Sequence, residues 1–172
     1  VQKTRSSYEA STILFAKLSR ATQGLGLSQD NLIQIVENIN KSFAISGARA
    51  EEAAYSIHQL AQGLAAGTLR GDEFNSVAEQ APKLLEIVAK HLKMNVGQLR
   101  EYASQGKITA DVITKALLGA TDDLQKEFAK MAMTVDGSMV MLQNSVLRAV
   151  GIIDQKLGIS SGIAKGIAAI AS

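Results

Sequence analysis

Apolar residues recur every three or four positions along nearly the whole chain, which is the period of an amphipathic α-helix. The clearest stripe lies between Ser28, a candidate N-cap, and Gly47, and it consists of Leu32, Ile35, Val36, Ile39 and Phe43. No run alternates apolar and polar residues as a half-buried strand would. The pattern therefore predicts an all-α fold.

Glycines and capping residues divide the pattern into short helices. Gly67 is expected to end one helix, because glycine readily adopts the left-handed conformation found after a helix C-terminus. Asp72 is a candidate N-cap, and Pro82 suits the first turn of the next helix, where its missing amide costs nothing. Asn95 with Gln98 resembles a capping box, and Thr109 is expected to cap the helix that follows. Several short capped helices in succession indicate a compact domain.

These signals divide the chain into three parts: a leading helix over residues 1–27, a compact helical core domain over residues 28–120, and an elongated helical extension over residues 121–172. A long stripe runs through Ile113, Leu117, Ala120, Leu124, Phe128 and Met131, and resumes as Leu142, Val146, Ala149, Ile153 and Leu157. Its regularity predicts longer helices on the C-terminal side.

Residues 158–172 form an apolar run rich in glycine and alanine. The run is short for a membrane-spanning helix and is interrupted by Lys165. Three interpretations stay open: packing against a missing part of a longer parent protein, contact with a host membrane, and disorder.

A weak internal repeat relates two segments 39 positions apart. Gln59-Leu60, Gly67, Leu69 and Asp72 align with Gln98-Leu99, Gly106, Ile108 and Asp111. Each copy reads as a helix, a glycine stop, a buried aliphatic residue and an acidic residue that begins another helix. Two unrelated helix–turn–helix units would give a similar pattern, so the repeat and the coincidence both remain possible.

Composition narrows the class of protein. Hydrophobic residues make up 47% of the chain but aromatic residues only 4%, so small aliphatic side chains must supply the core. The 18 basic and 16 acidic residues give a net charge of +2 and are interspersed, which does not indicate a specific nucleic-acid surface. The absence of cysteine excludes disulfides and thiolate metal sites. The chain begins at Val1 and stops in an alanine-rich tail, so we expect it to be a fragment.

No candidate for catalysis or metal binding survives inspection. His58 and His91 have no cysteine to complete a zinc site, and each is expected to be structural or at the surface. Asp122 and Asp123 suit the first turn of a helix better than a catalytic pair. The loop over residues 67–71 lacks the Gly-Lys-Ser/Thr of a phosphate-binding loop. The sequence therefore predicts a protein that is not an enzyme, with no catalytic, cofactor-binding or metal-binding residues.

The region between Ala48 and Leu118 carries the most specific pattern in the chain. Its segments are Gln59-Leu60, Gly67-Thr68-Leu69-Arg70-Gly71-Asp72-Glu73-Phe74-Asn75, Glu79-Gln80-Ala81-Pro82, Val96-Gly97-Gln98-Leu99-Arg100 and Gly106-Lys107-Ile108-Thr109-Ala110-Asp111-Val112. In combination they resemble the N-terminal domain of phage and prophage tail tape measure proteins.

This resemblance implies a structural virion protein without catalytic residues or cofactors. Tape measure proteins occupy the lumen of the tail tube, set tail length during assembly in the host cytoplasm, and leave the tail when DNA is ejected. The implied partners are the tail tube protein and tail assembly chaperones, and the apolar run fits contact with the host membrane.

Two further interpretations compete with the resemblance. A stand-alone helical adaptor or regulator could bind a partner helix through alanine-rich grooves, and a membrane-active protein could use the C-terminal run. Self-association through helices is also possible. Arg70, Lys83 and Arg100 are expected at the surface, either as docking residues or as solvated charges, so no binding residue is assigned.

Overall fold

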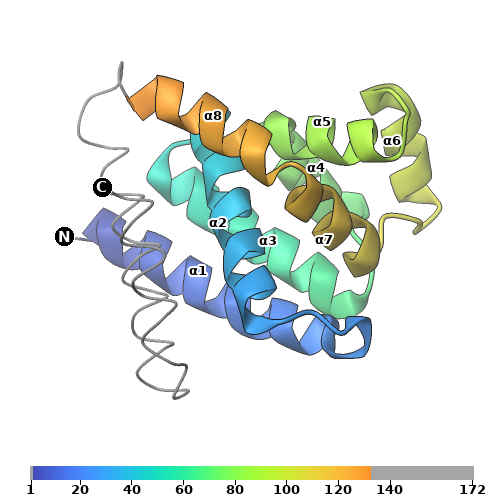
Figure 1. Ribbon diagram of the computed structural model, residues 1–172, viewed down its shortest axis with the longest axis horizontal. Helices are drawn as coiled ribbons and strands as arrows, with labels where there is room; N and C mark the ends of the chain where they lie inside the picture. Colours follow the sequence, from blue (N-terminus) through green and yellow to red (C-terminus); the bar gives the residue numbers. More distant parts are fainter. Residues whose placement is uncertain (1, 133–172) are drawn as a thin grey trace.

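The computed structural model describes residues 2–132, which are helical almost throughout (Figure 1). The described residues form α1 (Gln2–Ala21), the short 3-10 helix η1 (Gln23–Leu25), α2 (Gln29–Ile45), α3 (Ala50–Ala66), α4 (Gly71–Gln80), α5 (Pro82–His91), α6 (Val96–Ser104), α7 (Ala110–Gly119) and α8 (Thr121–Ala132). Over this range no strand is present, and the predicted all-α fold is confirmed.

The helix ends follow local capping chemistry. The Ser28 hydroxyl accepts a hydrogen bond from the amide of Asn31 at 3.1 Å. Asn95 and Gln98 form the predicted capping box, with reciprocal bonds of 2.8 and 2.9 Å. Pro82 is the first residue of α5, as predicted. Each cap satisfies amides that the first turn of a helix leaves without intrahelical partners.

One predicted cap is wrong. Asp72 is the predicted cap of α4, but the helix begins two residues earlier than that cap would allow, at Gly71, and Arg70 occupies the N-cap position. Gly71 has a φ of 58°, a left-handed conformation that glycine adopts without steric cost. Asp72 therefore lies in the first turn of α4, where its negative charge still favours the helix dipole.

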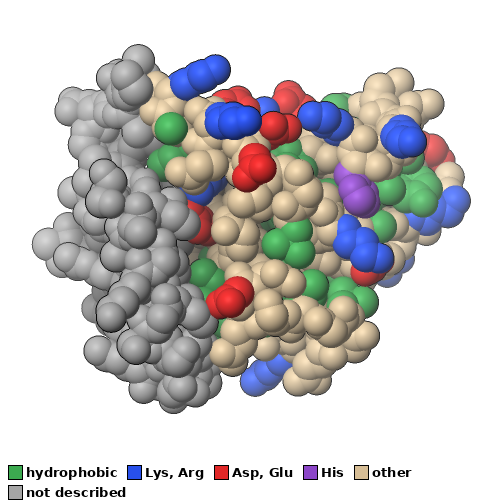
Figure 2. All heavy atoms as spheres, viewed as in Figure 1, with side chains coloured by type: hydrophobic (Ala, Val, Ile, Leu, Met, Phe, Trp, Pro, Cys, Tyr) green, Lys and Arg blue, Asp and Glu red, His purple; other side chains and the backbone are tan. Residues whose placement is uncertain are grey.

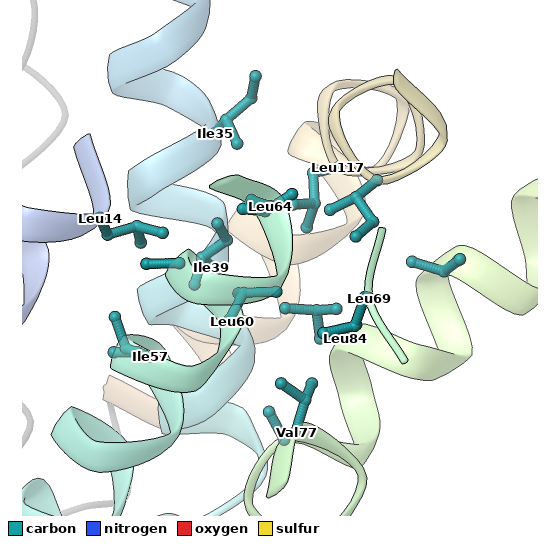
Figure 3. Packing of buried hydrophobic residues seen from close by; sticks show 14 of the residues in the cluster. Leu14, Ile35, Ile39, Ile57, Leu60, Leu64, Leu69, Val77, Leu84 and Leu117 are labelled. Atoms are coloured by element: carbon teal, nitrogen blue, oxygen red, sulfur yellow. The ribbon is translucent and has the colours of Figure 1, made fainter. Parts of the chain in front are cut away.

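A single apolar cluster runs through the described domain. Figure 3 shows side chains from α3, α4, α5 and α7, together with Leu69, pointing into the same interior. The largest fully buried side chains are Phe43, Leu14, Leu18, Ile35, Ile39, Leu60, Leu64, Leu69, Leu84, Leu85, Leu99 and Ile108. Aliphatic side chains dominate this core, as the low aromatic content predicts.

Helix α1 belongs to this core. It packs along α3, and Leu14, Phe15 and Leu18 are buried in the common cluster (Figure 1). Its partner α3 presents small side chains, including Ala53 and Ala61, which allow two helices to approach closely. The boundary predicted at residue 27 therefore lies within one packed body.

The predicted long stripe from Ile113 to Met131 is broken into two helices. Helix α7 ends at Gly119 and α8 begins at Thr121. The Asn38 side-chain amide donates a 2.9 Å hydrogen bond to the carbonyl of Leu117, which helps to satisfy the end of α7. The apolar period continues across the break because Leu117 and Leu124 both pack into the same core. The second stripe and residues 158–172 lie outside the described residues.

The internal repeat seen in the sequence also relates whole helices of the structure. Helices α4 and α7 begin at Gly71 and Ala110, and α5 and α8 begin at Pro82 and Thr121. Both pairs of starts are separated by the 39 positions of the sequence repeat. The domain thus contains two units of similar plan, α3–α5 and α6–α8. This agreement favours a repeated unit over coincidence.

Candidate functional site

The two repeat units meet at their corresponding loops. Thr68 and Thr109 form an isolated antiparallel bridge, and the amide of Leu69 donates a 2.8 Å hydrogen bond to the carbonyl of Ile108. The side chains of Leu69 and Ile108 are both fully buried. Each of the loops that follow α3 and α6 thus places one aliphatic side chain in the core, and the hydrogen bond between the loops joins the two units.

Glycines allow the backbone to make this junction. Gly67 and Gly106, at equivalent positions of the repeat, have φ angles of 96° and 68°. Only glycine adopts such angles without strain. Gly63 in α3 serves a different purpose, because a Cβ atom there would lie 3.1 Å from the Cδ1 atom of Leu69. The absence of a side chain at Gly63 makes room for Leu69.

This geometry gives the segments of the family resemblance a structural role. They supply the glycine turns, the buried aliphatic residues and the bridge between the two units. A phosphate-binding role for residues 67–71 does not fit, because Leu69 at the centre of the loop points into the core (Figure 3).

Arg100 joins α6 to α4 at the surface. Its guanidinium lies 5.7 Å from the centre of the Phe74 ring, in a cation–π arrangement. It also donates a 3.3 Å hydrogen bond to the side-chain carbonyl of Asn75. Arg70 is exposed at the start of α4. Both arginines lie at the surface as predicted, and Arg100 has a structural role there because it contacts Phe74 and Asn75.

Lys83, the third predicted surface residue, faces α8. Its ammonium group lies 2.5 Å from a carboxylate oxygen of Glu127 and 4.0 Å from one of Glu86. Farther along α5, Lys90 lies 3.4 Å from a carboxylate oxygen of Asp123. Two ion pairs thus connect α5 with α8, and Asp123 takes part in one of them.

A buried polar group on α2 also contacts α8, and the sequence analysis missed it. Lys41 is only 5% exposed, yet its ammonium group contacts Glu37 at 2.5 Å and the side-chain carbonyl of Gln125. The same group lies 5.9 Å from the centre of the Phe128 ring. Asn38 donates a second 2.9 Å bond, to the hydroxyl of Thr121. The sequence signal for this contact is the position of Asn38 and Lys41, which lie beside the apolar stripe of α2.

Two shallow hollows mark the surface of the described domain. The first, of about 330 Å³, lies between α5 and the α7–α8 pair, with Ala116 and Ala120 in its wall and the two α5–α8 ion pairs nearby. The second, of about 540 Å³, lies between α3 and α4 beside the exposed Tyr55. Its acidic lining consists of Glu51, Glu52, Asp72 and Glu79.

The described residues assemble no metal site. His58 lies 3.3 Å from the side-chain nitrogen of Gln62, and His91 is exposed beside the first hollow. Within residues 2–132, no three histidine or acidic side chains are close enough together to hold a metal ion.

A membrane-spanning helix must be both long and apolar. None of the described helices combines the length and apolar character needed to cross a bilayer. The predicted membrane contact concerns residues 158–172, outside the described part.

Comparison with known proteins identifies the family. No curated protein and no solved structure matches the chain. A family model described as "Tape measure protein" matches residues 1–155, which include every described helix and both repeat units. The resemblance inferred from the loop segments is therefore confirmed. The chain belongs to the tape measure protein family, a structural component of phage tails.

Proposed function

We propose that residues 2–132 form a docking domain of a phage tail tape measure protein. In this proposal the protein occupies the lumen of the tail tube, sets tail length during assembly in the host cytoplasm, and leaves the tail on DNA ejection. The domain anchors one end of the tape measure to the tail tube protein or to a tail assembly chaperone.

The observation that carries this proposal is the compactness of the domain. A continuous α-helix rises about 1.5 Å per residue and can therefore encode a length in its residue count. The described residues instead form helices of 9 to 20 residues around one core. Such a body suits attachment better than measurement, which requires an extended chain.

The surface offers features that a partner could recognise. Both basic and acidic side chains gather along the edge formed by α8 and α5 (Figure 2). The hollow between α3 and α4 is acidic and contains an exposed tyrosine. Charged rims with aromatic anchors are typical of protein–protein contacts. These features support a docking role without selecting the partner.

The docking role can be tested in the phage with a single substitution. Leu69→Asp places a charge at a fully buried position and should unfold the domain. We expect few or no tails by electron microscopy. Val96→Ala, at an exposed position, is the control and should give normal tails. Immunoblotting of infected cells distinguishes loss of docking from loss of the protein. Tails of normal number and length with Leu69→Asp would contradict the docking role.

The measuring role requires a different experiment. In this proposal an in-frame deletion of about 100 residues from the extended helical part of the phage's tape measure protein should shorten tails by about 150 Å. Unchanged length would contradict the ruler. Normal tails in both experiments would favour the helical adaptor instead.

A further inference from the structure

The attachment of α8 differs from that of its repeat counterpart, α5. Helix α5 contributes Leu84, Leu85, Ile87, Val88 and Ala89 to the common core. Among the described residues of α8, only Leu124 belongs to that cluster, although Phe128 is also buried. Apolar packing therefore holds α5 in the first unit, whereas α8, at the equivalent position of the second unit, buries far fewer apolar side chains in the core.

Polar and charged contacts take the place of much of the apolar packing that α8 lacks. Glu127 and Asp123 pair with Lys83 and Lys90 of α5. On its other side, α8 places Gln125 and the Phe128 ring against the ammonium group of Lys41 on α2. Lysines of α2 and α5 thus face carboxylates, an amide oxygen and an aromatic ring on α8.

The two α5–α8 ion pairs are the salt-sensitive part of this attachment, because all four of their side chains are at least partly exposed, Lys83 and Glu127 at 24% and 41%. Exposed ion pairs contribute about 0–1 kcal/mol each, because water and dissolved ions screen them. Asp123 and Lys90 are mostly exposed, with side-chain exposures of 69% and 82%. Elements with few buried apolar contacts open before the whole domain unfolds.

We propose that α8 is a charge-held latch, which detaches from α2 and α5 while α1–α7 remain folded. Detachment separates the two α5–α8 ion pairs and uncovers Lys41, whose burial includes its contacts with Gln125 and Phe128. The α7–α8 break at Ala120 is the hinge. The open form releases the 12 residues of α8 from the body, about 18 Å of helix. This inference is independent of the proposed docking role, because the isolated chain must show it.

The test is amide hydrogen exchange on the 172-residue chain, with α3 as the internal reference. Salt at about 0.01 M and about 1 M gives Debye lengths of about 30 Å and 3 Å. We expect exchange in α8 to become about three- to tenfold faster at high salt, relative to α3, from the loss of two ion pairs. Equal protection of α8 and α3, or an unchanged ratio between them, would overturn the latch.

Variants link the opening to particular charges. Lys83→Gln with Lys90→Gln should speed exchange of α8 at low salt and remove most of its salt dependence. Lys115→Gln is the matched control, because it removes a 2.9 Å ion pair to Asp111 within α7 and leaves α8 untouched. If the double variant fails to fold, the salt series on the unaltered chain decides. A control that affects α8 as much as the double variant would contradict the proposal.

Lysine acetylation followed by peptide mass spectrometry gives a second readout. Lys41 should react faster at high salt in parallel with exchange of α8, while Lys93, an exposed residue in the loop after α5, keeps its rate. Reaction of Lys41 only on global unfolding would show that α8 does not open separately.

Discussion

The amide of Leu69 donates its hydrogen bond to the carbonyl of Ile108, the residue at its own position in the other repeat unit. Both side chains are fully buried in the core that the two units share. The stability of the two halves should therefore be coupled through this pair.

A double-mutant cycle measures that coupling. Leu69→Ala and Ile108→Ala should each lower the free energy of unfolding by about 2–4 kcal/mol, through lost burial and a residual cavity. Because the residues meet, the double variant should depart from additivity by at least about 0.5 kcal/mol. Urea unfolding followed by circular dichroism gives the values. Val96→Ala, at a 43% exposed position, should change stability by less than about 0.5 kcal/mol. Strict additivity would mean that the units are energetically independent.

The turn after α3 should require glycine. Gly67→Ala forces a side chain into a φ of 96° and should cost about 1–2 kcal/mol, although the space around it is open. Gly24→Ala is the matched control, because its φ is not left-handed and its surroundings are equally open. Thermal unfolding of both variants tests the difference. Similar melting temperatures would show that the angle at Gly67 relaxes without cost.

Asn38 should contribute substantially to the stability of the fold, although its side chain is polar. Its side-chain amide bonds both the carbonyl of Leu117 and the hydroxyl of Thr121, each at 2.9 Å. Asn38→Ala leaves a carbonyl near the α7–α8 junction without this donor, so we expect a loss of about 1–3 kcal/mol in urea unfolding. Thr121→Val removes one of these acceptors and the hydroxyl's own 2.9 Å bond to the carbonyl of Leu118. It keeps the bond from Asn38 to Leu117, so it should cost less. The reverse order of the two variants would contradict this account of the junction.

Ser56 offers a route to higher stability. Its hydroxyl is fully buried and, among the described side chains, is the one buried polar group without a hydrogen-bond partner. Ser56→Ala removes a desolvated hydroxyl and should be neutral or stabilising by about 1 kcal/mol. Ser42→Ala is the comparison, because that buried hydroxyl bonds the carbonyl of Asn38 at 2.8 Å. A larger loss of melting temperature at position 56 than at position 42 would refute the prediction.

The sequence predicts best what depends on neighbouring residues. The caps at Ser28, Asn95 and Thr109 involve residues three positions apart, so their chemistry is visible in a short window. The buried position of Leu69 could also be inferred, since an aliphatic residue interrupts a polar link.

Features set by distant contacts were not accessible in this way. The break before α8 depends partly on Asn38, which lies 79 positions from its partner Leu117. The burial of Lys41 depends on Gln125, 84 positions away. The apolar pattern also hides the break between α7 and α8, because the three- to four-residue spacing of apolar positions continues across it when both helices face the same core.

The compact packing of the described residues has a consequence for the calibration of phage tails. As one unbroken helix, residues 2–132 would span about 200 Å; folded, they contribute no such extension. Under the proposed measuring role, a plot of tail length against the number of tape measure residues should have a slope given by the extended helix and an intercept displaced by this domain. Residues inserted in the exposed turn around Gly24 should leave tail length unchanged. Under the proposed measuring role, the number of residues in the gene and the number that measure would be different quantities.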